Sequence, residues 1–227
     1  MEASRGHAMS RDGTRISFTV TQARKADAPW IVLANGPWPL PPLGLVDYLG
    51  DRYRFAWWDP RGMGGSSGPA ASDRQAHAVE RHVEDLDAVA RASGIEEAAF
   101  VGLGTGTQVA LEAYRRRPGT VRALVLVAGT FGRERIEAPA AVLRSGLRSL
   151  AARLATRHPR EATRLVRRVA ASRSGVFLAR RLGLVGADLD DAEAAELVGA
   201  LADSDLEPIL ETMLAARDHD AARILPE

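Results

Sequence analysis

The residues best suited to do chemistry lie in the stretch 100–112, FVGLGTGTQVALE, where an apolar run meets a glycine-rich turn and a helical pattern follows at once. A turn this sharp between a strand and a helix usually presents either a nucleophile or the backbone N–H groups that bind a phosphate. The turn itself reads GLGTG at 102–106. The spacing of its glycines can therefore be compared with both kinds of site.

The phosphate-binding pattern G-x-G-x-x-G is matched only in part. Gly102 and Gly104 occupy its first two glycine positions, but its third position holds Thr107. A dinucleotide site also needs an acidic residue near the end of the next strand, to bind a ribose hydroxyl. The next apolar run, 123–129, ends without one, so the sequence supports a nucleotide cofactor only weakly.

The nucleophile elbow, G-x-S-x-G, is matched at both flanking glycines, Gly102 and Gly106. Its central serine position holds Gly104, which has no side chain and cannot be acylated. Thr105 carries a hydroxyl one residue later, but neighbouring residues in such a turn point in different directions. Thr105 is therefore a weak candidate for the nucleophile.

The elements around this turn alternate between strand and helix patterns. Short apolar runs predict strands at 14–20, 30–34, 54–59, 98–102 and 123–129, and helical patterns cover 43–49, 76–92 and 107–117. This alternation predicts an α/β fold with a mostly parallel sheet and helices on both faces. After residue 132 the pattern becomes helical throughout, which predicts a core at 1–132 and an all-helical region at 133–227.

Four segments in order resemble the α/β-hydrolase fold family. The elbow is one of these segments, together with the helix, the proline and the strand that follow it. The segment WIVLANGPW (30–38) is similar to the family's early strand and the oxyanion loop that follows it. The segment WWDPRGMGGSSGP (57–69) is similar to its D-x-R-G-x-G-x-S pattern. The resemblance covers about 12–132 and implies that 133–227 form a helical cap.

The resemblance implies acyl transfer by a serine, a histidine and a carboxylate, with backbone N–H groups binding the oxyanion. The implied oxyanion and pocket residues are Asn35, Gly36, Trp38 and Thr105, and Pro37 lacks an N–H. Gly104 stands at the nucleophile position, and the chain ends at Glu227 before the family's acid and histidine segments. We therefore expect an incomplete, truncated fold that is catalytically impaired and that binds a small apolar or acyl ligand or a partner chain. The alternative is an active hydrolase of small esters that uses Thr105 or a residue of another chain.

The histidines offer no evident replacement. His77 and His82 lie on the helix before the elbow strand, where surface or half-buried positions are expected, and His7 lies in a presumed N-terminal tail. His219 stands between two aspartates, but neighbours in sequence do not share a helix face. We expect neither a metal ion nor a cofactor.

The helical region divides its charge. Residues 133–181 hold 13 Arg against 3 Glu, whereas residues 188–220 hold 11 acidic residues against 1 Arg. One interpretation is a polyanion-binding surface on the arginine-rich half. Two helical layers with complementary charge explain the pattern as well, and no aromatic residues alternate with the arginines to stack on bases. Nucleic acid is therefore an unlikely partner.

Composition narrows the remaining classes. The chain has no cysteine, which excludes disulfides and thiolate catalysis, and its net charge is +1. It shows no apolar leader and no uninterrupted apolar run of membrane-spanning length, so we expect a cytoplasmic protein without membrane segments. If no strand follows 123–129 in the sheet, that strand is an apolar edge at which a homodimer could form.

Overall fold

The computed structural model describes residues 3–23, 25, 27–37, 43–70, 75–129, 131, 157–170, 172, 174–181 and 188–222. The chain divides into two compact units, one made of Met1–Glu134 with Glu211–Glu227 and the other of Arg135–Leu210. The first boundary lies two residues from the predicted one. Residues 211–227, which the sequence analysis assigned to the cap region, group with the core instead.

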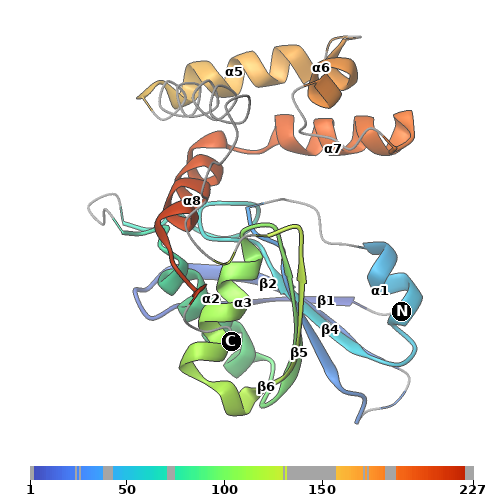
Figure 1. The fold of residues 1–227 in the computed structure, drawn as a ribbon, viewed down its shortest axis with the longest axis vertical. Coiled ribbons are helices and arrows are strands. Elements are labelled where there is room, and N and C mark those ends of the chain that lie inside the picture. Colours follow the sequence, from blue (N-terminus) through green and yellow to red (C-terminus); the bar gives the residue numbers. More distant parts are fainter. Residues whose placement is uncertain are drawn as a thin grey trace. The chain divides into compact units, whose positions relative to one another are not determined.

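In the described residues, six strands form one sheet in the order β1-β2-β4-β3-β5-β6 (Figure 1). Their bounds are β1 Ala3–Met9, β2 Arg15–Thr21, β3 Trp30–Ala34, β4 Arg54–Trp58, β5 Ala98–Leu103 and β6 Val121–Val127. The pairs β3–β4, β3–β5 and β5–β6 are parallel, and β1–β2 and β2–β4 are antiparallel. The predicted mostly parallel sheet is confirmed.

Helices cover both faces of this sheet, as predicted. Figure 1 shows α2 (Val79–Ala92) and α3 (Gly106–Arg116) on one face and α1 (Leu43–Leu49) on the other. Successive residues of a strand point to opposite faces. In β3, Val32 therefore joins the buried cluster beside α2 and α3, whereas Ile31 and Leu33 join the cluster beside α1. Apolar residues at every position of β3 are explained by these two buried faces.

The first strand is the element that the sequence analysis missed. Residues 3–9 pair along their whole length with β2, so His7 belongs to a strand and not to a tail. The segment ASRGHAM lacks an apolar run because most of its side chains are exposed. Gly6 is needed there, since a Cβ would lie 2.7 Å from the ring of Phe18.

The opposite edge of the described sheet is β6. Its side chains are mostly exposed, and Val125, Leu126 and Val127 keep 49%, 39% and 43% of their surface open. The apolar edge predicted for 123–129 is therefore present, because the described residues pair only with its β5 side. The homodimer expected at this edge remains a prediction.

The second unit is helical in its described part. It contains α5 (Pro159–Ala170), α6 (Gly175–Arg181) and α7 (Asp191–Asp203), and α8 (Leu206–Asp218) begins in it and ends in the first unit. Ala179, Ala194 and Val198 form its small buried cluster. None of the helices in the described ranges is long and apolar enough to cross a membrane.

Candidate functional site at the strand-to-helix elbow

The glycine-rich turn is a crossing from a central strand into a helix, as predicted. β5 ends at Leu103 and α3 begins at Gly106, so only two residues make the turn. Gly104 has φ +56°, a left-handed conformation that costs other residues energy. Its N–H donates to the carbonyl of Val127 over 2.9 Å, and its own carbonyl accepts from Thr107 N–H over 3.1 Å. The backbone of an elbow is thus complete.

The glycines around the turn are required by close contacts. A Cβ on Gly106 would lie 1.8 Å from the carbonyl oxygen of Ala34, and one on Gly102 would lie 2.7 Å from Thr107 Cα. A Cβ on Gly129 would lie 2.0 Å from Thr107 Oγ1. At Gly104, by contrast, a Cβ would meet no atom of the described chain within 4 Å. The position where an elbow carries its nucleophile is open and has no side chain.

The loop after β3 lies directly against the start of α3. Gly36 has φ +61°, and a Cβ there would lie 2.5 Å from Thr105 Oγ1. The structure therefore brings Asn35, Gly36 and Thr105 together, as the sequence analysis expected. Trp38, the fourth residue expected here, lies outside the described residues.

A hollow of about 20 Å³ lies between this loop, the elbow and the second half of α8. Asn35, Thr105, His82 and Thr212 are among its lining residues. Asn35 Oδ1 and Thr105 Oγ1 are buried and have no hydrogen-bond partner among the residues that the structure describes. Buried polar atoms are nearly always partnered, and a polar group or a water molecule in this hollow would partner these two atoms. The volume of the hollow fits one oxygen-sized group.

Two histidines and a threonine form a buried chain beside the hollow. His77 and His82 are only 8% and 4% exposed, so the expectation of surface or half-buried histidines was wrong. Thr212 Oγ1 lies 3.3 Å from His77 Nδ1 and 3.4 Å from His82 Nε2. His77 Nε2 lies 3.0 Å from a carboxylate oxygen of Glu211. Sequence reasoning missed this group because its two halves lie far apart in the chain, and no local pattern joins them.

The model of the alpha/beta hydrolase fold matches residues 34–212, which is most of the chain. The chain belongs to the alpha/beta hydrolase fold family. It is also 29% identical over 126 residues to RutD of Escherichia coli O6:H1, a protein to which carbamate hydrolysis is ascribed. That match covers 53% of this chain and 44% of RutD, so it spans less than half of the curated relative.

Solved structures show that the alpha/beta hydrolase fold extends over nearly the whole chain. An esterase from Exiguobacterium antarcticum has a TM-score of 0.68 at 17% identity, covering 97% of this chain and 76% of its own. The esterase RhEst1 from Rhodococcus sp. ECU1013 has a TM-score of 0.65 at 24% identity, with the same coverages. At these identities the likeness concerns the fold alone.

In this family member, burial keeps both histidines neutral. Burial, helped by the positive charge of Arg61, lowers the pKa of His77 from 6.5 to about 4. Burial and the charges of Arg61 and His77 lower the pKa of His82 to about 3. A neutral imidazole can accept a proton from a hydroxyl, so both side chains are in the form that a general base needs.

The segment that matched D-x-R-G-x-G-x-S has a structural role in this hydrolase fold. Arg61 is fully buried, and its guanidinium donates to both carboxylate oxygens of Asp85 over 2.6 and 2.9 Å. It also donates to Asp12 over 2.8 Å and to the carbonyl of Ala76 over 2.8 Å. The one remaining N–H, on Nη2, is shared between the Ser10 hydroxyl and the carbonyl of Arg81, each 3.3 Å away.

A second group of ionisable residues joins α3 to the end of α8. Possible metal-binding atoms of Glu80, Glu112 and His219 lie within 4.8 Å of one another in the described part of the chain. Glu112 already accepts hydrogen bonds from Arg115 over 2.6 and 2.7 Å and from Arg116 over 2.8 Å. Although burial acts in the opposite direction, these bonds lower the pKa of Glu112 to about 2. Two guanidinium groups therefore supply the positive charge that a metal ion would bring.

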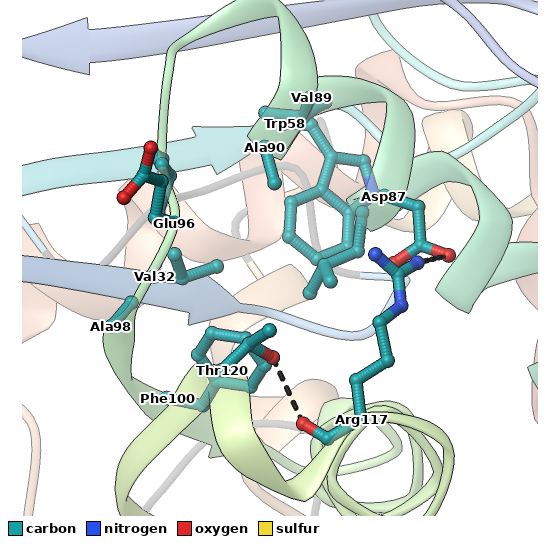
Figure 2. Close-up of a pocket in the computed structure, with 12 residues that line it drawn as sticks. Val32, Trp58, Asp87, Val89, Ala90, Glu96, Ala98, Phe100, Arg117 and Thr120 are labelled. Carbon is teal, nitrogen blue, oxygen red and sulfur yellow. Dashed lines mark hydrogen bonds and ion pairs between the residues drawn. The ribbon is translucent and has the colours of Figure 1, made fainter.

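A larger hollow of about 40 Å³ lies near the amino ends of β5 and β6, away from the elbow. Figure 2 shows that the Trp58 ring, Val32 and Phe100 fill much of its wall, with the Arg117 guanidinium beside the Asp87 carboxylate at one side. These polar groups are already paired with each other.

Proposed function

We propose that this alpha/beta hydrolase-fold protein binds the carbonyl group of a small acyl compound at the elbow without attacking it from Gly104. The observation that carries the proposal is the elbow itself. Its backbone and its surrounding glycines are retained, while the position of the nucleophile has no side chain. The protein is then a catalytically impaired member of its family, which retains the groups that bind a carbonyl and lacks the nucleophile that attacks it.

The hollow supports a carbonyl oxygen as the bound group. It has room for about one oxygen, and the Thr105 hydroxyl beside it has no hydrogen-bond partner among the described residues. The Thr105 hydroxyl can donate a hydrogen bond to a carbonyl oxygen, whereas Asn35 Oδ1 can only accept one. The N-terminus of α3 adds a partial positive charge at the same place.

The test is binding of methyl acetate, measured by saturation-transfer NMR on the full chain. We expect the wild type and Gly104→Ser to bind it equally, because the hollow does not use a side chain at 104. Thr105→Val should weaken binding about tenfold, since it removes one donor and keeps the shape. Thr120→Val, whose hydroxyl bonds the carbonyl of Arg117 away from the elbow, is the matched control.

Equal binding by wild type and Thr105→Val would contradict the proposed carbonyl site. Ester turnover that disappears in Thr105→Val while binding persists would instead favour an active hydrolase with Thr105 as nucleophile. The expected cytoplasmic location and the polyanion-binding alternative remain predictions that these measurements do not address.

A second proposal concerns partners, and the exposed strand β6 supports it. We propose that two copies pair through this edge, because Val125 and its neighbours are apolar and largely exposed there. Val125→Lys would place a charge at the edge and should convert dimers to monomers, measured by light scattering after size-exclusion chromatography. A monomeric wild type at micromolar concentration would contradict this pairing.

A further inference from the structure

The arginine-rich half of the helical region is only partly paired with the acidic half. Residues 157–181 hold eight Arg against one Glu. Arg180 bonds Asp191 over 2.8 Å, as two layers of complementary charge would predict. On α5, among the described residues, Arg164 pairs only with a glutamate of its own helix, over 3.8 Å, and Arg168 pairs with no acidic group. Complementary layers therefore do not explain the charge on α5.

These two arginines lie on the exposed face of α5. The helix packs against α6 and α7, and its residues Ala162 and Val169 are partly buried. Arg164, Leu165 and Arg168 are exposed, and Leu165 keeps 63% of its surface open. Residues three and four apart share a helix face, so the three exposed side chains are neighbours. The helix thus presents an apolar side chain next to two positive charges.

The neighbouring helix α6 adds two exposed apolar side chains. Figure 1 shows α5 and α6 on the same side of α7, and the two helices are in contact. Ala179 of α6 joins the buried cluster of this unit, whereas Phe177 and Leu178 keep 70% and 36% of their surface open. Large exposed apolar residues beside an excess of one charge are typical of an interaction surface. We call this surface the outer face, and its residues are Arg164, Leu165, Arg168, Phe177 and Leu178.

We propose that the outer face binds the surface of a membrane that contains anionic phospholipid. The arginines bind the lipid phosphates, and the three apolar side chains enter the layer between the headgroups and the acyl chains. The binding is peripheral, since only side chains of α5 and α6 enter the lipid. The outer face belongs to the second unit, so this inference is independent of the carbonyl site at the elbow.

Charge complementarity identifies anionic lipid as the partner. An anionic membrane attracts clustered arginines, and a guanidinium can donate two parallel N–H bonds to phosphate oxygens. Nucleic acid carries phosphates too, but proteins hold its bases by stacking them on aromatic rings. The outer face offers one ring, Phe177, beside two leucines. Leucine side chains suit acyl chains and offer no surface on which a base can stack, which favours the membrane.

The test is co-sedimentation of the full chain with vesicles of equal parts phosphatidylcholine and phosphatidylglycerol. The wild type should bind these vesicles in about 50 mM NaCl and lose most of the binding in about 300 mM NaCl, because salt screens exposed charges. Each arginine near an anionic surface strengthens binding about fivefold, so Arg164→Gln combined with Arg168→Gln should weaken it about 25-fold. Glutamine is a good helix former, so this double variant keeps α5.

Matched variants in the first unit separate the outer face from a general effect of charge or exposure. Arg91→Gln combined with Arg122→Gln removes two exposed arginines there and should leave vesicle binding unchanged. Phe177→Ser should weaken binding about tenfold, since it removes an apolar ring from the lipid layer. Tyr48→Ser is its control, because Tyr48 is 80% exposed on α1 and lies outside the outer face.

Four results would overturn the inference. The first is no binding to the anionic vesicles at low salt, and the second is equal binding to vesicles of phosphatidylcholine alone. The third is unchanged binding in the double variant of Arg164 and Arg168. The fourth is tighter binding to a short DNA duplex than to the vesicles, which would assign these arginines to nucleic acid. None of these results bears on methyl acetate binding, so the carbonyl site stands or falls separately.

Discussion

The buried network of Arg61 and the hollow at the elbow differ in whether their buried polar atoms have hydrogen-bond partners. Around Arg61, every N–H of the guanidinium has an acceptor, and both oxygens of Asp85 are used. At the elbow, the buried oxygens of Asn35 and Thr105 have no partner. A completed network leaves no buried charge without a partner, whereas polar atoms without a partner beside a hollow can bind a water molecule or a ligand.

The difference is informative because both regions resemble family patterns in the sequence, although the elbow has Gly104 in place of the serine. The D-x-R-G segment and the elbow segment each contain small residues and a few polar ones. Only the partners of the polar atoms distinguish a structural motif from a binding site. The predictions below test this distinction, starting with the largest expected effect.

Removing one partner from the Arg61 network should be the most damaging change. Asp85→Ala leaves a fully buried guanidinium without its main counter-ion, which typically costs about 3–5 kcal/mol. Urea unfolding followed by circular dichroism measures this loss. Glu97→Ala, which removes an exposed ion pair with Arg122, should cost less than about 1 kcal/mol. A small loss for Asp85→Ala would show that the completed network contributes little.

Acidification should weaken the fold through the histidines beside the hollow. Because the folded-state pKa values of His77 and His82 are about 4 and 3, the unfolded chain binds protons below pH 6.5 that the folded chain does not. Stability is therefore full above pH 6.5 and falls by a few kcal/mol as the pH drops towards 4. Urea unfolding at several pH values should show this fall, and it should be smaller in His82→Phe. An unchanged pH dependence in that variant would contradict the buried, neutral state.

A side chain at the open elbow position should cost little. Gly104→Ser meets no described atom nearby, but it holds a non-glycine residue at φ +56°, which costs about 1–2 kcal/mol. Gly119→Ser is the matched control, because that glycine also has open space and no positive φ. A loss equal to that of a core substitution would show that position 104 is packed and not open.

Removing an unpartnered hydroxyl should have the smallest effect on stability. Thr105→Val keeps the shape of the side chain and removes an oxygen that has no hydrogen bond. Its free energy of unfolding should stay within about 0.5 kcal/mol of the wild type. Thermal unfolding checks this value. A loss above about 1 kcal/mol would mean that the hydroxyl has a structural partner, and the contrast with Arg61 would fail.

The sequence predicted the fold well because strand and helix patterns are local. The runs at 30–34 and 43–49 became β3 and α1 with the same bounds, and the elbow fell at the end of a central strand. β1 escaped prediction because an exposed edge strand has no apolar period to detect. The hydrogen-bonded group of Thr212, His77 and Glu211 was not predicted for a different reason. It depends on contacts between α8 and the residue His77 just before α2, and no sequence spacing within either segment predicts these contacts.

The hydrogen bond from Ala221 N–H to the carbonyl of Phe131, 2.7 Å long, joins two positions that are far apart in the chain. All the described strands precede Phe131, and this hydrogen bond brings together the two ends of the segment between Phe131 and Ala221. The entropy of closing such a segment grows only with the logarithm of its length. A change in the length of this segment should therefore cost little chain entropy while the order of the strands stays fixed.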